Sequence, residues 1–518
     1  MNLNSEKVLS GRVTLWIIGA VGVGLFLTTN LPWQLDDYDQ AKEAFISFEM
    51  IKEGHWLYQR TPLERLATKS PGMATKPPRV ATKPPLVGWI SAGLFAITRS
   101  WGLAWRLPSF LAAIAISVLL FRAGSVYRAA AALIGVSAFV FNLLTPRLAT
   151  LVRTDMPLAC VIFLIGLIHW QKVRRNEAWN SRDRWLIFAL LTAGLLIKGP
   201  IIYAFLLPGI VTFAIIRRRD GPSTPRDESV LPSDRTGAYR RIWCGWWPWY
   251  FSLATFLLWV IGGSIFVRGF FEQVVVREFI ARFGETIHRP QPLLFYLPHL
   301  LQKFFPWSVL VIALATLDLH SRQWRIRAVL REMKPETVWL VCWILGGLIL
   351  MSLIPSKRVD RIFPIVPPLC LLLAMQVGKI LPSEQLRARV LPWSLAALLL
   401  SIAFTTGYAV SKVTAGFRHH SAALVAFGRV VRSQAAAHHW RYEVIKSDDE
   451  GLLLYLEKMH FIEPERAIME WNRGNLDALV APVGKAPALM REMRDAALSQ
   501  LQSTQRQDES GSYVLITR

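Results

Sequence analysis

The sequence predicts a mainly α-helical membrane protein, a polytopic bundle of transmembrane helices that ends in a small soluble α/β domain. Of its 518 residues, 53% are hydrophobic, the mean hydropathy is +0.33, and the apolar residues gather in long uncharged runs that are not typical of soluble globular proteins. The net charge of +23 is concentrated in short segments between these runs. After residue 411 the long apolar runs stop and a shorter periodicity begins.

Hydrophobic runs that approach the length needed to cross ~30 Å of hydrocarbon recur along the first four fifths of the chain. They cover residues 13–31, 85–98, 107–121, 129–145, 156–171, 185–197, 201–216, 244–267, 304–319, 337–354, 362–380 and 391–411. The first run follows Lys7 and Arg12 and has no small-residue cleavage site before Pro32, so we expect an uncleaved span whose N-terminus lies inside.

Basic connections set the expected orientation. Segments 172–184, 217–241 and 322–334 are rich in Lys and Arg and are therefore expected on the cytoplasmic side. The same rule accounts for the net charge, so we expect no nucleic-acid partner. The opposite face then carries 32–84, Asp155, Lys198, 268–297, 355–361 and everything after 411.

The loop count contains one irregularity. If all three runs between residues 85 and 145 crossed the membrane, the first loop and Asp155 would lie on opposite sides of it. One of these runs should therefore be a half-span or a hairpin. The total is then 11 or 13 spans. The expected division is a transmembrane domain at 1–411, with a first periplasmic loop at 32–84, and a small periplasmic domain at 412–518.

The C-terminal part has the pattern of a small α/β domain, for which about 100 residues suffice. We expect an extended segment at 442–445, a helix at 450–459, a strand at 477–483, a charged helix at 486–503 and a final strand at 513–516. A second outside segment, 67–87, consists of three tandem heptads that begin Ala-Thr-Lys. Their prolines exclude a regular helix, so this loop should be extended.

The first outside loop carries a cluster of carboxylates, Asp36, Asp37 and Asp39. Apolar residues then recur at helical spacing from Ala41 to Ile51, which predicts an amphipathic helix lying along the membrane surface with acidic residues at its N-terminal end. These carboxylates either carry chemistry or only cap the helix and keep the loop solvated. Asp155, which begins a span, either caps a helix or works with Asp39 across an active-site cavity.

Basic residues on the same outside face run against the positive-inside bias. They are Lys83, Lys198, Arg282, Lys357, Arg358 and Arg361. We expect an anion to compensate them, and a lipid phosphate or pyrophosphate at the interface is the natural candidate. The alternative is ordinary headgroup contact and snorkelling. The four cysteines show no CxxC or Cys/His ligand spacing, so no cofactor is expected from them. A divalent metal stays open, because carboxylates and phosphate would meet in one site.

These residues resemble a known family. The pieces that match occur in family order: Asp39-Gln40 ahead of Glu49-Met50 and Gly54-His55-Trp56, Thr82-Lys83-Pro84-Pro85-Leu86, Arg106-Leu107-Pro108-Ser109, Arg153-Thr154-Asp155-Met156-Pro157, Lys198-Gly199-Pro200, Glu278 to Phe283, Phe305-Pro306-Trp307, and Ser356-Lys357 leading to Pro364 and Pro367-Pro368. The chain resembles the GT-C membrane glycosyltransferases, the family that includes the lipid A aminoarabinose transferase and, more distantly, the protein O-mannosyltransferases.

The resemblance implies transfer of a sugar from a polyprenyl-phosphate carrier to a lipid, glycan or protein acceptor. It implies a multi-pass protein of the bacterial inner membrane whose active site and C-terminal domain face the periplasm. Asp39 matches the family's catalytic aspartate and Asp155 its second functional carboxylate. Lys83, Lys198, Arg282, Lys357 and Arg361 match positions expected to hold phosphate, and Asp37 and Glu278 are further candidates.

The sequence departs from the family pattern at three points. Gln40 replaces the usual glutamate of an Asp-Glu pair, Arg361 stands where an aromatic is often found, and the duplicated Lys-Pro-Pro element makes Lys76 a rival to Lys83. Two other classes compete with the transferase: a polytopic lipid or oligosaccharide transporter or flippase, and a non-catalytic assembly protein. A transporter should bury polar residues at mid-membrane, whereas the candidate ionisable groups here stand at the ends of the runs.

Overall fold

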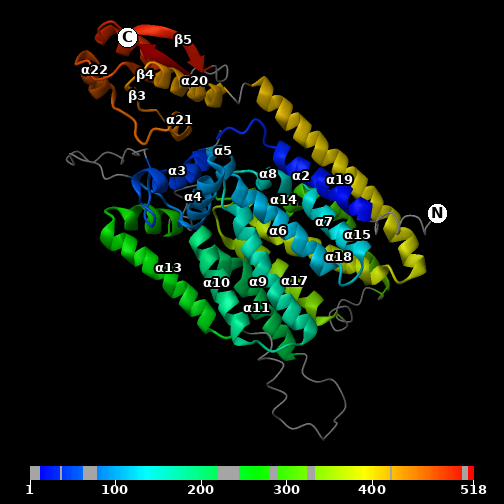
Figure 1. Ribbon diagram of the computed structural model, residues 1–518. Coiled ribbons are helices and arrows are strands. Elements are labelled where there is room, and N and C mark those ends of the chain that lie inside the picture. The colour runs from blue at the N-terminus through cyan, green and yellow to red at the C-terminus, as the bar shows by residue number, and fades with distance from the viewer. Residues whose placement is uncertain are drawn as a thin grey trace. The chain divides into compact units, whose positions relative to one another are not determined.

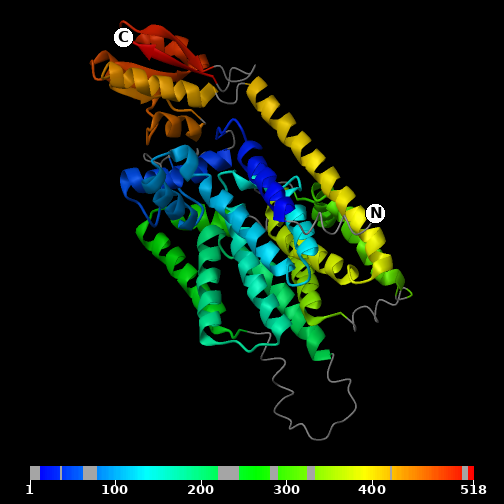
Figure 2. The same ribbon diagram turned by 45° about the vertical axis from the view of Figure 1, so that its right-hand side comes forward.

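The computed structural model describes residues 12–35, 38–61, 79–219, 244–280, 290–321, 323, 333–419, 423–447, 449–503 and 512–518 (Figures 1 and 2). The chain divides into two compact units. The first unit comprises residues 1–27, 108–150 and 154–408, and the second comprises 28–107, 151–153 and 409–518. This division differs from the one expected at residue 411, because the first loop groups with the C-terminal part.

All the regular secondary structure described in the first unit is helical. Its elements are α2 (Arg12–Thr28), α6 (Leu107–Gly124), α7 (Ala129–Val140), α8 (Thr145–Ala149), α9 (Asp155–Arg175), α10 (Ser181–Lys198), α11 (Ile201–Arg219), α13 (Trp247–Phe266), η2 (Phe271–Ile280), η3 (Leu293–Phe295), α14 (Tyr296–Lys303), α15 (Trp307–Ser321), α17 (Pro335–Leu353), η4 (Val359–Ile365), α18 (Val366–Ile380) and α19 (Glu384–Arg418), the last continuing into the second unit. Each predicted hydrophobic run contains a helix.

Six helices of the described chain are long and apolar enough to cross a membrane, or seven if the bent pair at 293–303 and 307–320 counts as one span. Shorter apolar helices accompany them at 13–28, 86–98, 129–140 and 201–216. Two of the three hydrophobic runs between residues 85 and 145, where we expected one irregular span, form such short helices. Helix α4 (Leu86–Thr98) has 13 residues and α7 has 12, so each is roughly 20 Å long and too short to span the hydrocarbon unaided.

Helices α9, α10, α11 and α17 run side by side in both views of the bundle (Figures 1 and 2). The contact between α11 and α17 depends on two glycines. A Cβ atom on Gly346 would lie 2.6 Å from the backbone nitrogen of Gly209, and one on Gly209 would lie 2.7 Å from the Cα atom of Trp343. Small residues therefore let these two backbones approach closely, as is common between membrane helices.

The second unit joins the first loop to the C-terminal part. From the first loop come α3 (Tyr38–Glu53), the antiparallel pair β1 (Arg60–Thr61) and β2 (Arg79–Val80), α4 and α5 (Trp101–Ala104). From the C-terminal part come α20 (Ala423–Ala437), β3 (Tyr442–Val444), α21 (Glu450–Leu456), α22 (Pro464–Asn472), β4 (Ala478–Pro482), η5 (Val483–Lys485), α23 (Ala486–Glu492), β5 (Ala497–Ser503) and β6 (Tyr513–Thr517).

The four C-terminal strands form one mixed sheet in the order β3-β4-β6-β5. Strand β3 pairs parallel to β4, while β6 pairs antiparallel to both β4 and β5. The predicted strands and the helix near residue 450 are present. The predicted helix at 486–503 is wrong beyond Glu492, because residues 497–503 form strand β5 and complete the sheet beside β6. Pairing with the following strand outweighs the local helical pattern there.

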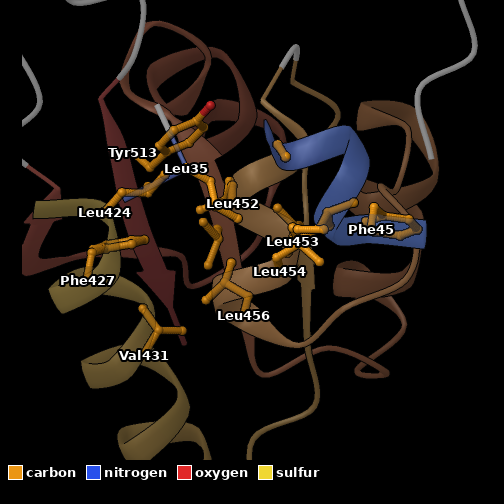
Figure 3. Packing of buried hydrophobic residues seen from close by; sticks show 14 of the residues in the cluster. Leu35, Phe45, Leu424, Phe427, Val431, Leu452, Leu453, Leu454, Leu456 and Tyr513 are labelled. Carbon is orange, nitrogen blue, oxygen red and sulfur yellow. The ribbon is translucent and has the colours of Figure 1, made fainter. Parts of the chain in front are cut away.

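The apolar face of α3 is buried by protein. Phe45 and Phe48 are 1% and 0% exposed, and they belong to a core with leucines of α21 and with Leu424, Phe427 and Val431 of α20 (Figure 3). Protein residues therefore cover the apolar face of this helix, while its position along the membrane surface stays a prediction. Alternating polar and apolar helical faces indicate a buried side but not what buries it.

Polar contacts secure the same junction between the first loop and the C-terminal part. The Tyr455 hydroxyl accepts a hydrogen bond from the Leu35 backbone N–H at 2.6 Å. The side-chain oxygen of Gln34 accepts one from the Leu424 backbone N–H at 3.2 Å. The helix that carries Asp39 is thus built into one body with the C-terminal sheet.

Candidate active site

Asp39 lies in the first turn of α3, where the positive end of the helix dipole favours a carboxylate. Its side chain is 35% exposed, although most of the helix around it is buried. The Arg153 guanidinium, which is only 7% exposed, lies 3.9 Å from the Asp39 carboxylate. An accessible carboxylate beside a buried cation is an arrangement that suits proton transfer and the binding of a charged group.

The contact made by Gln40 gives a reason for one departure from the family pattern, the replacement of glutamate by glutamine at this position. Its side chain is buried, and its amide oxygen accepts a hydrogen bond from the Val152 backbone N–H at 3.2 Å. Val152 directly precedes Arg153, so this bond ties α3 to the segment that faces Asp39. A neutral amide makes this contact without placing a buried carboxylate next to Asp39.

Lys83 is paired within the protein. Its ammonium lies 2.8 Å from the carboxylate of Glu43, whose side chain is 2% exposed. Beside it, Lys42 donates to the Thr82 hydroxyl at 2.8 Å. Glu43 lies one helical turn after Asp39, so the two carboxylates share a face of α3. Part of the negative charge expected beside Lys83 therefore comes from Glu43, within the protein, and not from a lipid.

Asp155 and Lys198 form a second buried ion pair, with side chains 8% and 17% exposed. Asp155 is the first residue of α9 and Lys198 the last of α10. These helices run antiparallel, so a carboxylate at an N-terminus meets an ammonium at a C-terminus, and both charges complement the helix dipoles. Lys198, like Lys83, therefore has a protein carboxylate as partner.

Lys357 and Arg361 lie where α17 leads into η4, and both donate to neutral oxygens. Lys357 is 7% exposed, and its ammonium donates to the Gln291 carbonyl at 2.9 Å. Burial lowers the pKa of Lys357 from its usual value. Arg361 donates to the Ser356 carbonyl at 2.6 Å. A buried ammonium bonded to a carbonyl dipole would be stabilised further by an anion.

The structure does not describe the side chains of the three remaining candidates. Asp37 and Arg282 lie outside the described residues, as does Lys76, the rival of Lys83. Glu278 lies in η2, a π-helical segment, and its side chain is not described.

Sequence reasoning missed two contacts of the candidate site. Glu43 was not singled out, although its spacing from Asp39 by one helical turn is a signal that the sequence carries. Arg153 belongs to a matched motif, yet no local pattern marks it as the partner of Asp39. The neighbouring bond from Val152 to Gln40 joins residues 112 positions apart, and a separation of that size leaves no periodic signal in the sequence.

Among the described residues, no group of three or more His, Cys, Asp or Glu side chains is arranged to hold a metal ion. The divalent metal that the sequence left open therefore has no such cluster in this part of the chain.

Comparison with known proteins agrees with this architecture. Residues 82–224 match the family model described as dolichyl-phosphate-mannose-protein mannosyltransferase, a segment that contains Lys83, Asp155 and Lys198. A stretch of 106 residues is 34% identical to undecaprenyl phosphate-alpha-4-amino-4-deoxy-L-arabinose arabinosyl transferase of Pectobacterium atrosepticum. That stretch is 20% of this chain and 17% of the relative, so the sequence match spans about a sixth of the relative's length.

The likeness in structure extends over nearly the whole chain. ArnT from Cupriavidus metallidurans bound to undecaprenyl phosphate superimposes with a TM-score of 0.69 at 16% identity, covering 98% of both chains. The chain has the GT-C fold of ArnT. The apo structure of the same ArnT gives a TM-score of 0.63 with the same coverage and identity. The GT-C resemblance expected from the sequence is therefore confirmed, while the roles of individual residues stay predictions.

Proposed function

We propose that this protein is an integral-membrane glycosyltransferase that moves a sugar from a polyprenyl-phosphate carrier to a lipid, glycan or protein acceptor. The observation that carries the proposal is Asp39, an accessible carboxylate on a mostly buried helix, facing Arg153 in a chain with the ArnT-like GT-C fold. The relatives in sequence are named as transferases, which favours this function over a transporter or flippase. The setting we propose is the bacterial inner membrane, with the reaction at its periplasmic face.

The reaction is a displacement at the anomeric carbon. The bond between that carbon and the carrier phosphate oxygen breaks, and a bond to the acceptor oxygen forms. Asp39 takes the proton from the acceptor hydroxyl, and the electron pair of the broken bond leaves with the phosphate. Phosphate is a competent leaving group, so positioning and charge stabilisation supply most of the acceleration.

Negative charge builds on the departing phosphate. The donor phosphodiester carries one negative charge, and the released monoester carries up to about two. We assign Lys357 to this group, because its buried ammonium donates to a carbonyl oxygen and gains from a nearby anion. Arg361, four residues further on, and Arg282 are assigned with it on the resemblance. Lys83 and Lys198, each held by a carboxylate, would contribute from within an ion pair.

Asp39→Asn tests the proposal, with Asp36→Asn as the matched control. Loss of a general base typically lowers a rate by ~10² to 10⁴, so Asp39→Asn should abolish measurable transfer from a polyprenyl-phosphate sugar in proteoliposomes. Asp36→Asn should keep most activity. Cellular lipids and glycans analysed by mass spectrometry, with and without the wild-type chain, identify the product to be followed.

Two results would contradict this assignment. Near wild-type transfer by Asp39→Asn together with loss in Asp37→Asn would move the base to Asp37. Unchanged envelope lipids and glycans in cells that lack the wild-type protein would argue against the transferase itself.

A further inference from the structure

A pocket lies at the end of α10 away from Lys198, in the helical bundle of the first unit. Its volume is about 460 Å³, and it is lined by Ser181, Arg184, Trp185, Phe188, Trp247 and Phe251. The 18 residues of α10 separate the two ends of the helix by roughly 27 Å. The pocket is therefore distinct from the charges assigned to the transfer reaction, and its ligand can be inferred independently of that reaction.

Aromatic rings from α10 and α13 form the walls of this pocket. Trp185 meets Trp247 edge to face, with ring centroids 4.9 Å apart, and meets Phe188 at 5.6 Å. Trp247 in turn contacts Phe251 at 6.2 Å. Because these contacts hold the rings in place, the walls are formed before any ligand binds.

Arg184 supplies the charged part of the pocket. Within the part of the chain that the structure describes, its buried Nε atom has no hydrogen-bond partner. The neighbouring carboxylate is already engaged. Asp183 lies 2.7 Å from the Lys172 ammonium and completes a capping box with Asn180 at the start of α10. Arg184 thus brings to the wall of the pocket a guanidinium with one donor that no described group pairs.

The surroundings point to a lipid. Trp185, Trp246, Tyr250 and Phe251 are exposed around the pocket, as is typical of the aromatic belt at a membrane–water interface. The basic segment 172–184 ends here, and such segments favour the anionic leaflet. A guanidinium binds a phosphate through two parallel hydrogen bonds, while the rings suit glycerol and acyl chains.

We propose that this pocket binds one anionic glycerophospholipid, with its phosphate on Arg184 and its apolar part between the rings of α10 and α13. A free phosphate would leave the aromatic walls uncovered. A zwitterionic lipid carries its own cation beside the phosphate and gains less from the guanidinium.

Native mass spectrometry of the detergent-purified full-length protein tests this. Phosphatidylglycerol, phosphatidylcholine and inorganic phosphate are titrated separately onto the wild type, Arg184→Gln and the control Arg182→Gln, which removes the same charge from an exposed neighbour. Loss of a charged hydrogen bond corresponds to about a tenfold change in affinity. The tightest phosphatidylglycerol site should therefore weaken about tenfold or more in Arg184→Gln and stay unchanged in Arg182→Gln.

A second variant, Trp247→Ala, removes one wall and should weaken the same site while Arg184 is retained. Circular dichroism and gel filtration establish that each variant is folded. Equal phosphatidylglycerol binding by the two arginine variants would overturn the proposal. So would equally tight binding of phosphatidylcholine by the wild type, or displacement of phosphatidylglycerol by millimolar inorganic phosphate.

Discussion

Replacing Phe45 by alanine should loosen a segment at the opposite end of the chain. Phe45 is 1% exposed and shares a core with Leu453 and Leu454 of α21 (Figure 3). Truncating a buried phenylalanine typically costs about 3–5 kcal/mol. If α3 and α21 open as one cooperative body, that cost appears in both segments, and amide exchange in each accelerates by roughly 10²- to 4 × 10³-fold.

Hydrogen exchange followed by mass spectrometry, on the protein in nanodiscs, measures this directly. The peptides to follow cover α3 and residues 450–456, under conditions where reclosing is faster than exchange. Ile51→Ala is the matched control, because Ile51 lies on the same helix and is 37% exposed. Its peptides should exchange almost as in the wild type. Faster exchange of α3 with unchanged exchange of α21 in Phe45→Ala would refute the shared core.

Two further predictions concern the first loop and the orientation of the chain. Lys83→Ala should depress transfer far more than Lys76→Ala, because Lys83 is paired to the buried Glu43 on the helix that carries Asp39. Equal losses in the transfer assay would mean that the repeated segment, and not one lysine, forms the phosphate contact. Cysteines introduced at positions 60 and 280, which are exposed, should react with a membrane-impermeant reagent added from outside. Those at 178 and 228 should not, because the basic segments are expected in the cytoplasm; outside labelling of 178 would invert the topology.

Several features of the fold follow from local sequence. Long apolar runs have to form helices in a membrane, since each backbone polar group must be satisfied within its own segment. This is why every predicted run contains a helix, although α4 and α7 are short. The strands at 478–482 and 513–517 were also predictable, because both are short apolar runs at the centre of a sheet.

The candidate residues could be named from motifs, but their partners could not. Lys83 pairs with Glu43 across 40 positions, and Lys198 with Asp155 across 43. A local pattern carries no information on which distant charge a side chain meets. The motifs therefore suggest that the lysines bind phosphate, but they do not reveal the carboxylates that pair with them. The Asp39 and Arg153 pair escapes sequence reasoning for the same cause.

The sequence by itself determined the membrane class, the helical runs and the candidate residues, because each depends on composition or on spacing within one segment. Only the tertiary structure decided what covers the apolar face of α3 and that residues 497–503 are a strand. Both depend on partners outside the segment itself: leucines of α21 bury Phe45, and β6, the next strand along the chain, pairs with β5. An amphipathic pattern records that a face is buried, and the surface that buries it is chosen by the packing of the whole unit.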